Sequence, residues 1–197
     1  MAQVSHQFTT LSALAILGTC GVFLATACNG DGPDDRVRIA EIDFGHPALR
    51  ECALEFGVSF KTEYADGLPE LGCPGSGIDN LRGVEHFVNV TWFNMSVNPI
   101  TDIEPIRTLD KLEIVELNST GVSDLSPLVE IVSIRRLWLQ GTNLTAGVNR
   151  LSMLVNLQKL VLVDAVVPCE QLDEFAANLP ASVEITPPIA IVRASCR

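Results

Sequence analysis

Apolar residues recur along this chain in a fixed order with a period of 22 residues. The stretch 87–106 ends on an Asp-apolar-x-Pro-apolar sequence, and the next 22 residues repeat both the spacing and this ending. The matching apolar positions are Phe87, Val90, Phe93, Met95, Ile100, Ile103 and Ile106, then Leu109, Leu112, Val115, Leu117, Val122, Leu125 and Leu128. A constant period of roughly 20 to 29 residues is typical of a stacked solenoid, in which each repeat buries its apolar side against the next.

The same frame extends in both directions and predicts about five repeats over residues 65–167. The added positions are Leu68, Leu71, Cys73, Ser76, Ile78, Leu81 and Val84 before it, and Ile131, Ile134, Leu137, Leu139, Thr142, Leu144, Leu154, Leu157, Leu160 and Leu162 after it. After Pro168 the pattern becomes helical, with the sequence CEQLDEFAANL. Val183 and Ile185 then fall 23 residues after Leu160 and Leu162, which predicts a sixth, closing strand in that register.

The residues ahead of the repeats predict a cap over their open end. Val37, Ile39 and Ile42 predict a short strand. Pro47 then begins a predicted helix, PALRECALEF, because proline is tolerated in the first turn of a helix. Its inner face would carry Leu49, Cys52, Ala53 and Phe56. A cap is required physically, because the first repeat otherwise exposes the edge of its core.

These repeats resemble the 22-residue, internalin-like class of leucine-rich repeat, and IDFGHPALREC resembles the N-terminal cap of bacterial proteins of this kind. The resemblance implies an α/β solenoid with parallel strands on the concave face, a helical N-terminal cap, and a C-terminal helix plus closing strand. It also implies that Asn98 bonds the turning backbone. Ser76, Thr120 and Thr142 replace this asparagine in other repeats, and Ala165 lacks a polar group, so we expect weaker hydrogen bonding at the fifth turn.

The N-terminus has the features of an export signal. Residues 1–27 contain no Lys, Arg, Asp or Glu, and a run of apolar or small residues leads to Ala27 and Cys28. This resembles a bacterial lipoprotein signal, in which Cys28 carries the lipid, including palmitate, and becomes the mature N-terminus. Asn29 after the cysteine resembles outer-membrane sorting if the organism is Gram-negative. Secretion after cleavage at Ala27, or an uncleaved anchor, remain alternatives.

The chain therefore divides into five expected segments. They are a lipoprotein-type signal peptide at 1–27, a flexible tether at 28–38, an N-terminal cap at 39–64, leucine-rich repeats at 65–167, and a C-terminal helix, closing strand and tail at 168–197.

Six cysteines are many for a cytosolic chain of 197 residues and indicate an oxidising compartment. Cys52 falls on the inner face of the cap helix and Cys73 at an inward position of the first repeat, so a disulfide between them would join the two. Such a bond stabilises by roughly 3 kcal/mol on loop-entropy grounds. Cys169 and Cys196 would join the other end in the same way. The alternative for the first pair is two buried free thiols.

Charge and motifs narrow the function. A net charge of −11 and a pI of about 4.6 argue against nucleic acid, because phosphate binding needs a basic face. No phosphate loop, dinucleotide fingerprint, nucleophile elbow or zinc-type cysteine spacing occurs, so we expect no enzyme activity, cofactor or metal. His46 and His86 are interpreted as solvated or capping residues, and Asp102 and Asp124 as turn caps rather than a weak cation site.

The repeat pattern also predicts which side chains face outward, because strand side chains alternate. The first outward column is Glu70, Trp92, Ile114, Arg136, Lys159 and Ser182; the second is Gly72, Asn94, Glu116, Trp138, Val161 and Glu184; the third is Pro74, Ser96, Asn118, Gln140, Val163 and Thr186. Both tryptophans fall on this face beside apolar residues and an arginine, a composition typical of binding hot spots. The residues expected to bind a partner are Trp92, Asn94, Ile114, Glu116, Arg136, Trp138, Lys159 and Val161. The alternative is cross-strand packing with no partner.

The sequence thus favours an exported, envelope-tethered binding module that recognises a protein or peptide on its concave face. The inference rests on analogy of fold. One rival hypothesis is a structural lipoprotein within a permanent envelope assembly. Another is an enzyme or binder acting on envelope polysaccharide, with the tryptophans stacking on sugars.

Overall fold

The computed structural model describes residues 34–180 and 182–196. Clustering of the chain gives two compact units, Met1–Asp34 and Asp35–Arg197, and everything below concerns the second. The expected signal peptide, the lipidation site Cys28 and most of the expected tether lie outside the described residues. No helix within the described part is long and apolar enough to cross a membrane.

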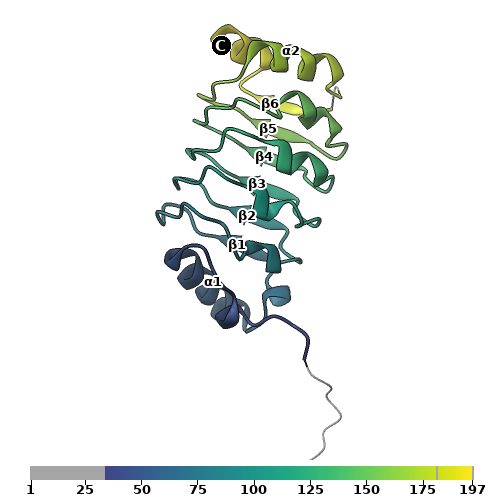
Figure 1. The fold of residues 1–197 in the computed structure, drawn as a ribbon. Helices are drawn as coiled ribbons and strands as arrows, with labels where there is room; N and C mark the ends of the chain where they lie inside the picture. The colour runs from purple at the N-terminus through teal and green to yellow at the C-terminus, as the bar shows by residue number, and fades with distance from the viewer. Residues whose placement is uncertain (1–33, 181, 197) are drawn as a thin grey trace, which may run out of the picture. The chain divides into compact units, whose positions relative to one another are not determined.

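Six short parallel strands form one sheet in the order of the sequence, which confirms the predicted α/β solenoid (Figure 1). They are β1 (Glu70–Gly72), β2 (Trp92–Asn94), β3 (Ile114–Glu116), β4 (Arg136–Trp138), β5 (Lys159–Val161) and β6 (Glu184–Thr186). Strand-to-strand register follows the sequence period, so that Leu71, Phe93, Val115 and Leu137 lie side by side and are fully buried. Their stacking makes one continuous core.

Short 3₁₀ helices return the chain between the strands. They are η2 (Ala65–Gly67), η3 (Val84–His86), η4 (Glu104–Ile106), η5 (Ser126–Glu130) and η6 (Asn149–Met153). Pro105 and Pro127 lie in the first turns of η4 and η5, where a missing N–H costs no internal hydrogen bond. Ile106 and Leu128 within these turns are fully buried, so each return segment contributes to the core behind the sheet.

The N-terminal cap consists of η1 (Ile39–Glu41) and α1 (Pro47–Phe60). His46 is the N-cap of α1, where its Nδ1 accepts a hydrogen bond from the Ala48 N–H at 3.1 Å. The strand expected around 37–42 is wrong. Ile39 and Ile42 are both buried three residues apart, and the Ile42 N–H donates to the Ile39 carbonyl, which is 3₁₀ spacing rather than strand alternation.

The C-terminal end is built from α2 (Cys169–Asn178), β6 and α3 (Ile189–Ser195). The predicted register of β6 is wrong by two residues, because Ile185 and not Val183 pairs with Leu160. The reason is that the ten-residue helix α2 replaces a short 3₁₀ return and uses more chain. Helix α3 lies in the expected tail and buries Val192.

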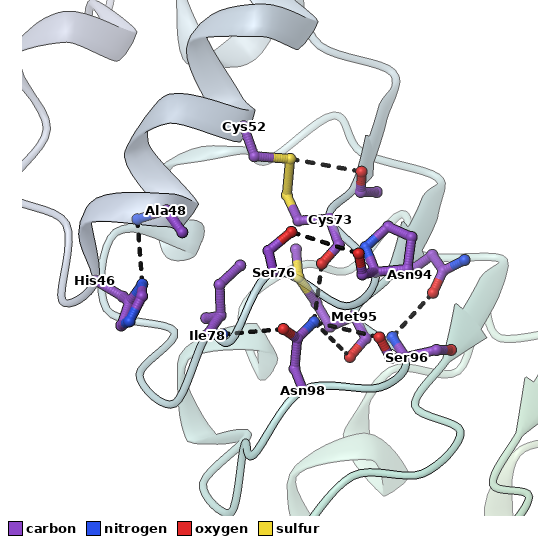
Figure 2. Close-up of a disulfide and its surroundings, with 12 residues drawn as sticks. His46, Ala48, Cys52, Cys73, Ser76, Ile78, Asn94, Met95, Ser96 and Asn98 are labelled. Carbon is purple, nitrogen blue, oxygen red and sulfur yellow. Dashed lines mark hydrogen bonds between the residues drawn. A yellow bond between two sulfur atoms is a disulfide. The ribbon is translucent and has the colours of Figure 1, made fainter.

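Two disulfides join the caps to the repeats. Cys52 in α1 is bonded to Cys73, directly after β1, and Cys169 at the start of α2 is bonded to Cys196 (Figure 2). Leu49 and Ala53 of α1 are fully buried, so the helix covers the first repeat as well as being bonded to it.

Asn98 supplies most of the side-chain hydrogen bonds at its turn (Figure 2). Its Nδ2 donates to the carbonyls of Cys73, Met95 and Ser96, and its Oδ1 accepts the Ile78 N–H at 2.9 Å. Thr120 and Thr142 each donate one hydrogen bond, to the carbonyls of Leu117 and Leu139. Asn98 therefore bridges two repeats, whereas the threonines tie only their own turn.

A left-handed residue follows each outward column at the end of the strands. The residues are Gly75, Val97, Ser119, Gly141 and Asp164, with φ between 53° and 65°. The N–H groups of the first four donate to carbonyls of the next repeat, at 2.7–2.9 Å. Val97 is the exception in chemistry, because a β-branched side chain is strained in this conformation.

We expect Val97→Asn to stabilise the protein by about 1 kcal/mol, because asparagine tolerates the left-handed region far better than valine. Val97 is 61% exposed, so little buried apolar surface is lost. Chemical denaturation of the two proteins measures the difference. Val88→Asn, at an exposed valine with no positive φ, is the matched control and should give no gain. Equal changes in both variants would contradict the assignment of strain to Val97.

Candidate functional site

The outward side chains of the six strands form a continuous surface, here called the strand face. In register, its first column is Glu70, Trp92, Ile114, Arg136, Lys159 and Glu184, and its second is Gly72, Asn94, Glu116, Trp138, Val161 and Thr186. All eight residues expected to bind a partner therefore lie on neighbouring positions of β2–β5. The slip of β6 by two residues keeps its outward side chains outward, but it moves Glu184 into the first column and Ser182 out of it.

The corrected position of Glu184 gives Lys159 a partner. Lys159 Nζ lies 2.8 Å from Glu184 Oε1, and the pair closes the C-terminal end of the first column. Both side chains are substantially exposed, so the pair contributes little to stability. Its consequence is electrostatic, because the positive charge of Lys159 is already balanced within the protein.

Trp92 is held by its own neighbours on three strands. Its Nε1–H donates to Glu116 Oε1 at 2.8 Å, and Glu116 Oε2 accepts from Asn94 Nδ2 at 3.3 Å. On the other side the ring covers Gly72, where an added Cβ would lie 2.7 Å from ring atoms Cζ3 and Cη2. Trp92, Asn94 and Glu116 thus form a bracing cluster across β1–β3, and the polar groups of Glu116 and Trp92 are engaged within the fold.

Trp138 has a different environment. It is half-buried, and its indole N–H has no hydrogen-bond partner within the described residues. On the same strand the exposed Arg136 forms no ion pair or hydrogen bond with any described residue. Ile114 on β3 is half-buried beside Arg136. Val161 is only 7% exposed, so it forms part of the floor of this region rather than a contact of its own.

The third column adds a ladder of polar side chains beyond the strands. Asn118 donates to Ser96 Oγ from both its backbone N–H and its Nδ2, at 3.2 Å in each case. Asn118 Oδ1 in turn accepts the Gln140 N–H at 2.9 Å. The ladder ends at Val163, which is apolar and half-buried. The polar edge of the strand face therefore becomes apolar at its C-terminal end.

The other candidate residues serve local structure. Oδ1 of Asp102 and Oδ1 of Asp124 each accept a backbone N–H two residues ahead, at 2.8 Å. Hydrogen bonds from the Ser126 side chain and backbone hold the pKa of Asp124 below its ordinary value. His46 caps α1, and His86 is exposed at the end of η3. Within the described residues, no group of three or more His, Cys, Asp or Glu is arranged to hold a metal ion.

Solved structures similar to this chain include two internalins of Listeria monocytogenes. Internalin C2 superposes with a TM-score of 0.60 at 20% identity, over 84% of this chain and 77% of its own. A second internalin superposes with a TM-score of 0.54 at 18% identity, over 82% of this chain and 57% of its own. This chain has the leucine-rich repeat fold. No family model and no curated protein matches the sequence.

The likeness establishes the fold and leaves the partner to the residues of the strand face. Sequence periodicity places Trp92 and Trp138 on that face as equals, whereas the structure separates a hydrogen-bonded tryptophan from one with a free N–H. No spacing signal could have made this distinction, because Glu116 reaches Trp92 across strands that lie 24 residues apart in sequence. The smallness of Gly72, one repeat before Asn94, is the single sequence feature that fits a covering ring.

The bracing cluster predicts an energetic coupling between Trp92 and Glu116. In a double-mutant cycle of Trp92→Phe and Glu116→Ala, we expect a coupling of about 1 kcal/mol in the free energy of unfolding, because only the tryptophan can donate. The matched cycle of Trp138→Phe with Glu116→Ala removes no hydrogen bond. Chemical denaturation of the single and double variants provides the values. A coupling as large in the Trp138 cycle would contradict the assignment.

Proposed function

We propose that the unit 35–197 is a non-enzymatic binding module that takes a protein or peptide partner on its strand face. The observation that carries the proposal is the juxtaposition of Trp138 and Arg136 on β4, an indole with a free N–H beside a guanidinium without an acidic partner. Tryptophan and arginine are the residue types most enriched where interfaces gain their affinity. Ile114 extends the apolar surface on the neighbouring strand.

Closure of both ends supports the strand face as the place of contact. Helix α1 with its disulfide covers the first repeat, and α2, β6 and α3 close the last. The likeness to internalins is consistent with a protein-interaction module, although it bears on fold alone. The same arrangement does not suit glycoside hydrolysis. Glu116 and Glu184 lie three strands apart, roughly 14 Å at strand spacing, and each is already engaged within the protein.

The partner-binding test compares the protein with its Trp138→Ala variant in native cells, using in-cell crosslinking followed by affinity measurement with the captured partner. We expect a loss of about 2 kcal/mol in binding free energy, since a central aromatic anchor is removed. Val155→Ala, at a 73% exposed valine outside the strand face, is the control and should bind as the original does. Equal affinity of Trp138→Ala and the original would remove the strand face from consideration.

We further propose that the module is exported and held at the cell envelope by a lipid on Cys28, at the outer membrane if the cell is Gram-negative. The support is the uncharged, apolar stretch 1–27 followed by cysteine, together with the paired cysteines of the folded unit, which suit an oxidising compartment.

Mass spectrometry of the mature protein tests the anchor directly. We expect an N-terminal peptide that begins at Cys28 and carries the added mass of acyl chains. Cys28→Ser should abolish that mass and release the protein from the membrane fraction, whereas Cys20→Ser, within the stretch 1–27, should change neither. An unmodified Cys28 or an intact N-terminus would refute the lipid anchor.

A further inference from the structure

The strand face contains one cation that the protein does not balance. In register, Arg136 lies between Ile114 and Lys159, and Lys159 is paired with Glu184 on its far side. The neighbouring carboxylate of Glu116 is engaged by Trp92 and Asn94. The chain carries 24 acidic against 13 basic residues, so a guanidinium left without an acidic partner among the described residues is exceptional. It forms a local positive site, suited to an incoming carboxylate.

An apolar groove lies beyond the C-terminal end of β5. It has a volume of about 350 Å³, and Val163, Ala165, Pro187 and Ile191 contribute to its lining. Helix α3 supplies one wall through Ile191, which is 58% exposed. Val163 belongs both to this groove and to the third outward column of the strand face, so the two surfaces are continuous. Asp164 also lines the groove and makes its far end acidic.

The spacing between the cation and the groove matches an extended chain. Arg136 pairs with Lys159, and Val163 lies four residues beyond Lys159, a rise of roughly 13 Å at about 3.3 Å per residue. Trp138 lies halfway along this path, paired with Val161. In an extended segment, side chains at positions i, i+2 and i+4 point to the same side. Three such side chains would meet Arg136, Trp138 and the groove in turn.

We propose that the partner of the strand face is an extended peptide segment with a carboxylate at one position and apolar side chains two and four positions away. This rests on the proposed function and names the chemistry of its ligand. The carboxylate pairs with the Arg136 guanidinium, the middle apolar side chain packs on the Trp138 ring, and the last enters the groove beside Ile191. Asp164 repels a carboxylate at the groove end, which fixes the order of the three along β4 and β5.

Selection from a library of random dodecapeptides displayed on phage tests the proposal with the protein itself. We expect the enriched peptides to contain Asp or Glu with apolar residues two and four positions away. A synthetic peptide of the enriched sequence should lose roughly tenfold or more in affinity against Arg136→Glu, because a hydrogen-bonded ion pair is replaced by repulsion. Ile191→Asp, which places a charge in the groove, should weaken the same peptide. Arg150→Glu makes the same charge change on η6, away from the strand face, and should leave the affinity unchanged.

The outcomes separate this proposal from the proposed function. Peptides that depend on Trp138 but bind Arg136→Glu as well as the original would overturn the acidic-apolar pattern and leave the binding face in place. Failure to enrich any peptide, or enrichment without the pattern, would overturn the inference while the crosslinking comparison still decides the face. Peptides indifferent to Trp138→Ala, Arg136→Glu and Ile191→Asp bind elsewhere and also contradict it.

Discussion

The structure depends on the stacking of inward side chains from one repeat onto the next. A strand of three residues with a short 3₁₀ return cannot bury its own apolar side, so each repeat is stable only between neighbours. Leu71, Phe93, Val115, Leu137 and Leu160 lie side by side with no exposed surface. The last inward residue of the series, Ile185, is half-buried. A stack of this kind requires closure at both ends, and here each closing segment is also bonded covalently to the chain.

Backbone geometry maintains the stack where side chains vary. The N–H groups at the left-handed position bond the next repeat whether the residue is glycine, valine or serine. Side-chain support is uneven by comparison: Asn98 makes four hydrogen bonds, Thr120 makes one, and Ala165 has no polar side chain to make any. The asparagine is therefore dispensable in most turns, because the connection between repeats is made mainly by the main chain.

Periodicity predicts what a repeat does alike in every copy, and it fails where the chain departs from the repeat. The inward positions, the parallel strands and the outward columns of β1–β5 follow from the spacing of 22 residues. The register of β6 could not be obtained that way, because the length of α2 is a local property of residues 169–178. The η1 turn was mistaken for a strand because three apolar residues in a short stretch fit both periods. Pairings such as Trp92 with Glu116 depend on side-chain rotamers, which the spacing does not encode.

The outward positions are free of the stacking constraint, and the two tryptophans show two uses of that freedom. Trp92 covers a glycine on one strand and bonds a glutamate on another, so its large surface and its single donor are both used inside the molecule. Its removal would disturb β1–β3 before it disturbed any partner. Trp138 leaves its donor open, beside the one arginine of the strand face that lacks an acidic neighbour, and on the strands that lead to the apolar groove. Binding chemistry therefore concentrates on β4 and β5, while β1–β3 provide the rigid part of the same sheet. A partner that gained its affinity from Trp92 would first have to break the hydrogen bond to Glu116, and a partner on Trp138 has no such cost.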